Sequence, residues 1–123
     1  MKSGLALYLA GPMTGLPRWN FDAFARERER LRAAGFRVWC PAEQDVRRGF
    51  DPNTPPPLPD GFERGALVRN VKELTRVDGV ALIGPPEGWN TSKGVLVELA
   101  VARYLNLTVR TVNHWLVRKE RKL

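Results

Sequence analysis

Residues 5–10, with the sequence Leu-Ala-Leu-Tyr-Leu-Ala, form a short continuous apolar run that ends at Gly11-Pro12. A run of this length, closed by turn residues, is typical of a parallel strand that is buried on both faces. Further along the chain, three more segments have the character of strands, at residues 36–40, 77–83 and 107–112. These four segments are the candidate strands of the fold.

Helical spacing of apolar residues predicts three helices between these strands, at residues 20–34, 62–76 and 92–104. Asn20 stands where it can cap the first helix, and Gly35 follows the end of that helix. Strands that alternate with helices in a short chain imply a parallel sheet covered by helices on both faces and joined by right-handed crossovers. We therefore predict an α/β fold with a parallel sheet of four to five strands.

The chain of 123 residues is long enough for one domain with a substantial core and too short for two. We assign residues 1–112 to this domain and residues 113–123 to a basic C-terminal tail. A proline-dense loop at residues 47–61 lies within the domain. Two interpretations of this loop stay open, a lid over a site and a disordered excursion.

The composition excludes several classes of protein. Cys40 is the only cysteine and His114 the only histidine, so neither an internal disulfide nor a structural zinc site is expected. No apolar stretch is long enough to span a bilayer, and the N-terminus lacks the pattern of a signal peptide. We therefore expect a cytoplasmic protein that does not contact a membrane and holds no metal.

The formal net charge of +7 raises the question of a nucleic-acid partner. Arginines within residues 26–32 alternate with glutamates, however, as on a solvated helix face with intrahelical ion pairs. The other basic cluster lies within residues 118–122, where a solvated tail and a polyanion-binding arm are both open interpretations. Excess positive charge also attracts a phosphorylated small molecule, and we expect such a partner rather than nucleic acid.

Glu98 is the residue that most strongly suggests a functional site. At about 100° per residue, its neighbours on the helix surface include Gly94 and Val95, so it lies in the middle of the apolar face of its predicted helix. A carboxylate in such a place costs free energy unless it is paired. Gly94, one turn earlier, has no side chain and lets a ligand approach the carboxylate. The alternative is a structural glutamate that pairs with an arginine at the edge of the core.

Three other residues are candidates for the same site. Ligands of open parallel sheets bind beyond the carboxyl ends of the strands, where the loops at residues 11–19 and 84–91 converge. Ser92 begins a helix, where backbone N–H groups favour an anion such as phosphate, although an ordinary N-cap is an equal alternative. Asp78 opens a strand and could simply cap it or pair with a neighbouring arginine. Tyr8 lies within the first strand and could belong to the core.

Taken together, these features resemble one protein family. The segments that carry the resemblance are Tyr8-Leu9-Ala10-Gly11-Pro12-Met13, Asn20-Phe21 with Phe24, Gly35-Phe36-Arg37-Val38, Asp78-Gly79-Val80-Ala81-Leu82, and Ser92-Lys93-Gly94 with Glu98 and Ala102. They resemble the nucleoside 2-deoxyribosyltransferase superfamily, and within it the small DUF4406 branch that is often met in bacteriophage and prophage genes. The resemblance covers nearly the whole chain outside the proline-dense loop and the basic tail.

The resemblance implies a flavodoxin-like (Rossmann-like) sheet, a homodimer or higher homo-oligomer, and a reaction without a cofactor. It implies that Glu98 is the catalytic nucleophile, that Asp78 is the acid that helps the leaving base, and that Tyr8 supplies an aromatic hydroxyl beside Glu98. The substrate-binding positions carried over are Gly11, Met13, Arg18, Asn20, Ser92 and Gly94.

The residue at position 92 also bears on the substrate. True transferases of the superfamily typically place Asp there to hold a 5′-hydroxyl, whereas its 5′-monophosphate N-glycosidases place Ser. An aspartate would repel a phosphate that a serine at a helix N-terminus accommodates. Ser92 therefore favours a monophosphate substrate, with Arg18 as a second candidate phosphate contact.

The expected function is cleavage of an N-glycosidic bond, or deoxyribosyl transfer, on a deoxynucleoside 5′-monophosphate or a deoxynucleoside. Glu98 would attack C1′ of the sugar in a double displacement, as in retaining glycosidases. Two alternatives remain at this stage. The domain could bind a nucleotide or an NAD-like ligand without turnover, or the basic tail could make it a nucleic-acid-binding protein.

Overall fold

The computed structural model describes the backbone of residues 4–121 and the side chains of residues 4–117. Four parallel strands form one sheet, in the order β2-β1-β3-β4. Their bounds are β1 (Ala6–Ala10), β2 (Arg37–Trp39), β3 (Gly79–Leu82) and β4 (Thr108–Thr111). The α/β class and the four predicted strands are confirmed, and the arrangement is that of a flavodoxin-like fold.

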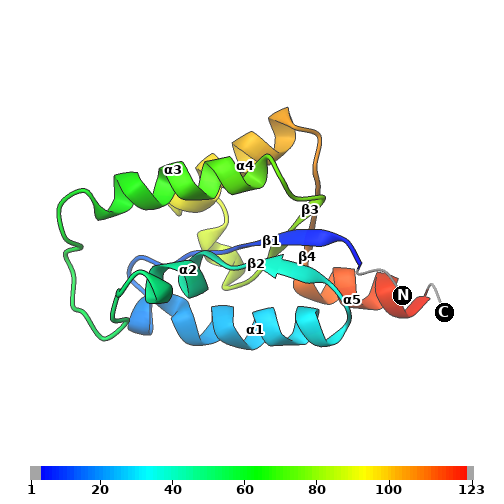
Figure 1. The fold of residues 1–123 in the computed structure, drawn as a ribbon, viewed down its shortest axis with the longest axis horizontal. Helices are drawn as coiled ribbons and strands as arrows, with labels where there is room; N and C mark the ends of the chain where they lie inside the picture. Colours follow the sequence, from blue (N-terminus) through cyan, green and yellow to red (C-terminus); the bar gives the residue numbers. More distant parts are fainter. Residues whose placement is uncertain (1–3, 122–123) are drawn as a thin grey trace.

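Helices cover both faces of the sheet, as predicted. Figure 1 shows α3 (Phe62–Leu74) and α4 (Lys93–Tyr104) on one face, with α1 (Phe21–Ala33) and α5 (Val112–Arg121) on the other. Helix α1 follows β1 on one face, whereas α4 follows β3 on the opposite face. The direction of winding therefore reverses between β1 and β3, and a crevice forms beyond their carboxyl ends in sheets of this kind.

Two helices, α2 and α5, were not predicted from the sequence. Helix α2 (Pro41–Arg47) begins with Pro41 in its first turn, where proline is favoured because its fixed φ suits a helix and its missing N–H is not needed. The proline that closes β2 thus also starts a helix. Short 3₁₀ turns at η1 (Pro17–Asn20) and η2 (Pro86–Gly88) complete the elements.

The prediction of a basic tail at residues 113–123 is wrong for its first part, because residues 112–121 form α5. Trp115 of this helix is buried in the core, and its indole N–H donates a hydrogen bond of 2.9 Å to the Val80 carbonyl. Its ring packs so closely on Gly79 that a Cβ there would lie 2.8 Å from it. The side chains of the basic cluster at residues 118–122 lie outside the described residues.

Alternation along β1 directs its side chains to two different core clusters. Leu7 and Leu9 pack with residues of α1 and α5, such as Phe24 and Trp115. Tyr8 faces the opposite way and belongs to the cluster beneath α3 and α4. The alternation of side chains along β1 therefore directs the Tyr8 hydroxyl towards α4.

The loops after β1 and β3 are tied together at the carboxyl edge of the sheet. Gly11 lies so close to the β3 loop that a Cβ would stand 2.3 Å from Ile83 Cγ1. Asn20 donates hydrogen bonds from its amide to the carbonyls of Pro12 (2.9 Å) and Gly84 (3.0 Å). Asn20 precedes α1 as predicted, but its side chain makes no cap hydrogen bond because it links these two loops instead.

The proline-dense loop packs against the domain, and the interpretation as a disordered excursion is wrong. Phe50 and Leu58 contact the core, and the Phe50 ring lies 4.9 Å from the Phe62 ring, centroid to centroid. The Trp19 indole donates a hydrogen bond of 2.8 Å to the Thr54 carbonyl. These contacts hold the loop over the carboxyl edge of the sheet. Within residues 4–121, no helix is both long and apolar enough to cross a membrane.

Candidate functional site

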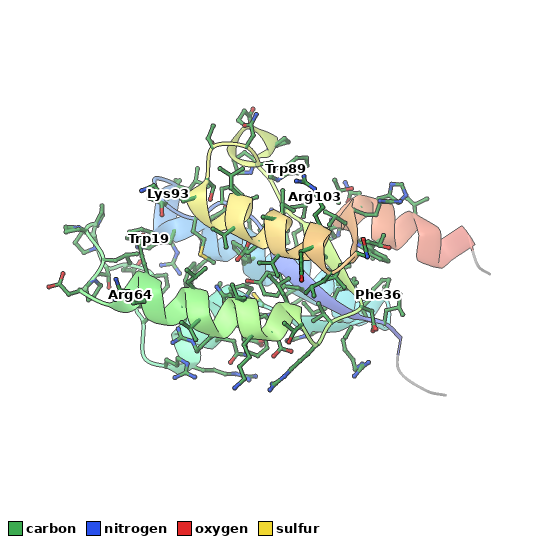
Figure 2. The ribbon with its side chains drawn as sticks, turned by 90° about the horizontal axis from the view of Figure 1, so that it is seen from above. Trp19, Phe36, Arg64, Trp89, Lys93 and Arg103 are labelled. Atoms are coloured by element: carbon green, nitrogen blue, oxygen red, sulfur yellow. The ribbon has the colours of Figure 1, made fainter. Side chains whose placement is uncertain are left out.

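A cavity of about 370 Å³ lies at the carboxyl edge of the sheet, between α3, α4 and the proline-dense loop. Its volume falls in the range of about 300–1,000 Å³ that is usual for small-molecule sites. Most of the wall is apolar, and Trp19, Phe21 and Phe50 contribute aromatic rings to it. Figure 2 shows Trp19, Arg64 and Lys93, from η1, α3 and α4, together at one end of the molecule. The cavity is therefore in the position that the topology predicts for a ligand.

Glu98 lines this cavity from the buried face of α4, with 8% of its surface exposed. Burial raises the pKa of Glu98 to about 7, although the hydrogen bond from Tyr8 lowers it in part. Among the described side chains, no arginine or lysine forms an ion pair with Glu98. The structural alternative of a glutamate paired at the edge of the core is therefore wrong.

Tyr8 is the polar partner of Glu98. The Tyr8 hydroxyl donates a hydrogen bond of 2.6 Å to Glu98 Oε2, and the ring is fully buried beneath α4. Burial, followed by the charge of Glu98, raises the pKa of Tyr8 well above its ordinary value. The hydroxyl therefore stays protonated at neutral pH and fixes one oxygen of Glu98, while the other is not engaged by any described side chain.

The first turn of α4 forms the wall next to Glu98. Ser92, Lys93 and Gly94 all line the cavity. The Ser92 side chain accepts a hydrogen bond of 3.4 Å from the Val95 N–H, so it is an N-cap as well as a cavity residue. A Cβ at Gly94 would meet only Ser92 Oγ, at 4.0 Å, so the protein itself leaves the space above this residue open.

The remaining predicted residues fall into two groups. Gly11 and Met13, in the loop after β1, line the cavity with Glu98. Arg18 and Asn20 do not line it. The Arg18 guanidinium pairs with Asp22 at 3.1 Å and donates to Asn53, on the outside of the proline-dense loop. The predicted contact between Arg18 and a phosphate at Ser92 has no support in this arrangement.

Asp78 is also absent from the cavity. It precedes β3 and accepts a hydrogen bond of 2.8 Å from the Ala6 N–H, at the amino edge of the sheet. The cavity lies at the carboxyl edge, beyond the full length of β3. Asp78 is therefore placed as a strand cap, the alternative that its position in the sequence had left open.

Sequence reasoning missed several residues of the cavity. Asn70 and Glu63 line it from α3, and Lys93 lines it from α4. Asn70 and Glu63 stand on one stripe of the predicted helix, since residues seven apart share a face. That spacing was visible in the sequence, but nothing indicated that this face of the helix borders a cavity.

A second buried carboxylate lies behind the site without entering it. Asp45 of α2 is 6% exposed and pairs with Arg69 of α3 at 3.3 Å. Burial raises the pKa of Asp45 to about 6, and the charge of Arg69 opposes this. The pair links α2 to α3. Within the described residues, no group of three or more His, Cys, Asp or Glu side chains could hold a metal ion.

Comparison with known proteins identifies a family for the chain. A family model described as a domain of unknown function, DUF4406, matches residues 5–111. The match spans all four strands and both helices that border the cavity. No curated protein matches the sequence.

Proposed function

The chain belongs to the DUF4406 family, and we propose that it cleaves the N-glycosidic bond of a deoxynucleoside 5′-monophosphate or deoxynucleoside, with Glu98 as nucleophile. The observation that carries this proposal is an unpaired, buried carboxylate that lines a cavity at the switch point of the sheet. Strongly perturbed carboxylates in clefts are characteristic of functional sites. A purely structural role would not explain why the carboxylate faces a cavity.

The first chemical step is attack of a Glu98 oxygen on C1′ of the sugar. A bond forms between Glu98 and C1′ while the bond from C1′ to the base nitrogen breaks, and its electron pair leaves with the base. Tyr8 holds one Glu98 oxygen by its hydrogen bond, so the other oxygen is the attacking atom. Attack by water on C1′ then breaks the bond to Glu98, whose electron pair returns to the carboxylate, and the proton that the water loses neutralises the base anion. A second base in place of water would give transfer.

Ionisation of Glu98 sets the pH dependence of this step. Because its pKa is about 7, the carboxylate form increases as the pH rises through neutrality. Positive charge that develops on the sugar in the transition state is stabilised by the same carboxylate, which is largely buried. We therefore expect kcat/KM to rise with pH up to about pH 8.

The start of α4 is the proposed position of the 5′ group. Its backbone N–H groups and helix dipole favour an anion, and Lys93 adds a positive side chain next to Ser92. The open space at Gly94 lies between this end and Glu98 along the helix. A phosphate at Ser92 would thus leave the sugar beside the carboxylate.

The leaving base needs a different partner from the one that the sequence suggested. Asp78 is at the other edge of the sheet, whereas the Asn70 side chain lines the cavity opposite α4. An amide N–H from Asn70 can donate a hydrogen bond to a base atom on which negative charge develops. Asn70 therefore replaces Asp78 in the proposed mechanism.

Chromatography of free base tests the proposal directly. The protein is incubated with each deoxynucleoside and its 5′-monophosphate, and base release is compared in wild type, Glu98→Gln and Glu73→Gln. Glu73 lies at the far end of α3, where it pairs with Arg76, so its variant is the matched control. Release that is lost in Glu98→Gln alone supports the mechanism, and equal release in Glu98→Gln contradicts it.

One observation favours a second candidate function. The described cavity wall contains no buried carboxyl group besides Glu98 that could protonate a leaving base. A site of this kind suits a domain that binds a nucleotide or NAD-like ligand without turnover. Saturable binding of a nucleotide by a wild-type protein that releases no base from any candidate would favour this function.

A further inference from the structure

A second cavity adjoins the one that contains Glu98. It has a volume of about 670 Å³ and lies between the proline-dense loop and the first turn of α3. Both cavities are lined by Thr14, Trp19, Leu58 and Glu63. These four side chains belong to the walls of both spaces, so the second cavity lies directly beside the first, next to the end of α3 that carries Glu63.

The surface of α3 that borders the first cavity carries polar side chains at two positions along the helix axis. Glu63 and Asn70 both line the cavity, with Ala66 and Leu67 between them. Two helical turns separate Glu63 from Asn70, or about 10 Å along the axis. Among the described side chains, neither Glu63 nor Asn70 has a hydrogen-bond or ion-pair partner. Both groups are available to a ligand.

The two helices that flank the cavity mouth offer different chemistry. Ser92 and Lys93 at the start of α4 suit a phosphate. Glu63 at the start of α3 is exposed at the junction of the cavities. An ionised carboxylate only accepts hydrogen bonds and repels a phosphate. The base, rather than the phosphate, therefore suits the side of the cavity formed by α3 and the loop.

We propose that the leaving base lies along α3 and that Glu63 accepts hydrogen bonds from its outer edge, an inference that rests on the proposed function for the position of the sugar. The two carboxylate oxygens match an edge with two adjacent N–H donors. Guanine carries such a pair at N1 and N2, whereas thymine flanks its single N–H with carbonyl oxygens. Trp19 and Phe50 supply aromatic surface for stacking. The substrate class is a guanine deoxynucleotide.

A comparison of dGMP with dIMP isolates the predicted contact, because hypoxanthine lacks only the N2 amino group of guanine. Affinities are measured by calorimetry on the Glu98→Gln protein, which retains an oxygen to accept the Tyr8 hydrogen bond. A bidentate contact at a solvent-exposed carboxylate predicts that dGMP binds about tenfold more tightly than dIMP. Glu63→Gln on this background reduces the ratio towards one by weakening dGMP, whereas Glu73→Gln leaves the ratio unchanged.

Equal affinity for dGMP and dIMP overturns the inference, and so does a preference that persists in Glu63→Gln. The proposed function is judged separately, by base release from the wild-type protein. If no base is released and Glu63→Gln still abolishes a preference for dGMP, then the catalytic proposal fails while the role of Glu63 stands. If base is released at equal rates from dGMP and dIMP, and both bind equally, then the role of Glu63 fails alone.

Discussion

Replacing Glu98 by glutamine should stabilise the folded protein at pH 8 and leave its stability nearly unchanged at pH 4. In the folded protein burial raises the pKa of Glu98 from 4.5 to about 7, whereas the unfolded chain exposes it to water. Between pH 4.5 and 7 the unfolded chain loses its proton while the folded protein keeps it, so stability falls over this window and is level above it. At about 1.4 kcal/mol for each pKa unit, the cost of the wild-type carboxylate at pH 8 is on the order of 3 kcal/mol.

Urea unfolding followed by tryptophan fluorescence measures this difference, since Trp19 and Trp115 are buried. The free energy of unfolding is compared for wild type and Glu98→Gln at both pH values. The buried Asp45, whose pKa is raised to about 6, is present in both proteins and cancels in the difference. Glu63→Gln, which removes an exposed rather than a buried carboxylate, is the control for the loss of one negative charge. An effect of Glu98→Gln that is the same at pH 4 and pH 8 would refute the reasoning.

Three further predictions concern base release by the wild-type protein and its variants. Tyr8→Phe removes the hydrogen bond that lowers the pKa of Glu98, so the pH at which kcat/KM reaches half its maximum should move upward, as a pH–rate profile would detect. In Gly94→Ala the added methyl group meets no protein atom closer than 4.0 Å, so thermal unfolding should show no loss of stability. The KM should rise at least about tenfold, because the methyl group enters the space proposed for the sugar. An unchanged KM would contradict the proposed position of the sugar. Ser92→Asp keeps a capping side chain but places a negative charge at the proposed phosphate position. Cleavage of deoxynucleoside monophosphates should therefore fall at least about tenfold relative to cleavage of deoxynucleosides. An equal fall for both substrates would argue against a phosphate at this position.

Local sequence pattern predicted most of the sheet and the central residue of the site. A continuous apolar run located β1, because a strand buried on both faces needs such a sequence, whereas alternation along residues 36–40 located β2. The angular position of Glu98 among apolar neighbours predicted its burial, and that prediction is confirmed. Both inferences depend only on the period of one element, which is why they did not require knowledge of the tertiary structure.

The errors arose where a residue serves two purposes or where two elements meet. Pro41 closes a strand and begins α2, so its turn signal was interpreted in only one of the two ways. Val112 and Trp115 have the spacing of a buried helix face, but the basic residues that follow them are also typical of a solvated tail, and the segment was predicted as a tail. Glu63 and Asn70 could not be assigned because the cavity depends on how α3 packs beside α4 and beneath the proline-dense loop.

Asp78 shows how topology can correct a resemblance. A residue that precedes a parallel strand lies at the amino edge of the sheet, whereas ligands bind beyond the carboxyl ends. The position of Asp78 before β3 was therefore sufficient to separate it from Glu98, and its hydrogen bond with the Ala6 N–H agrees with that placement. Any acid or hydrogen-bond donor for the leaving base must instead come from the loops, from α3 or from α4, since the polar side chains that line the cavity belong to these segments. Asn70 and Glu63 meet that condition, and this is why both the proposed chemistry and the proposed base selectivity depend on α3.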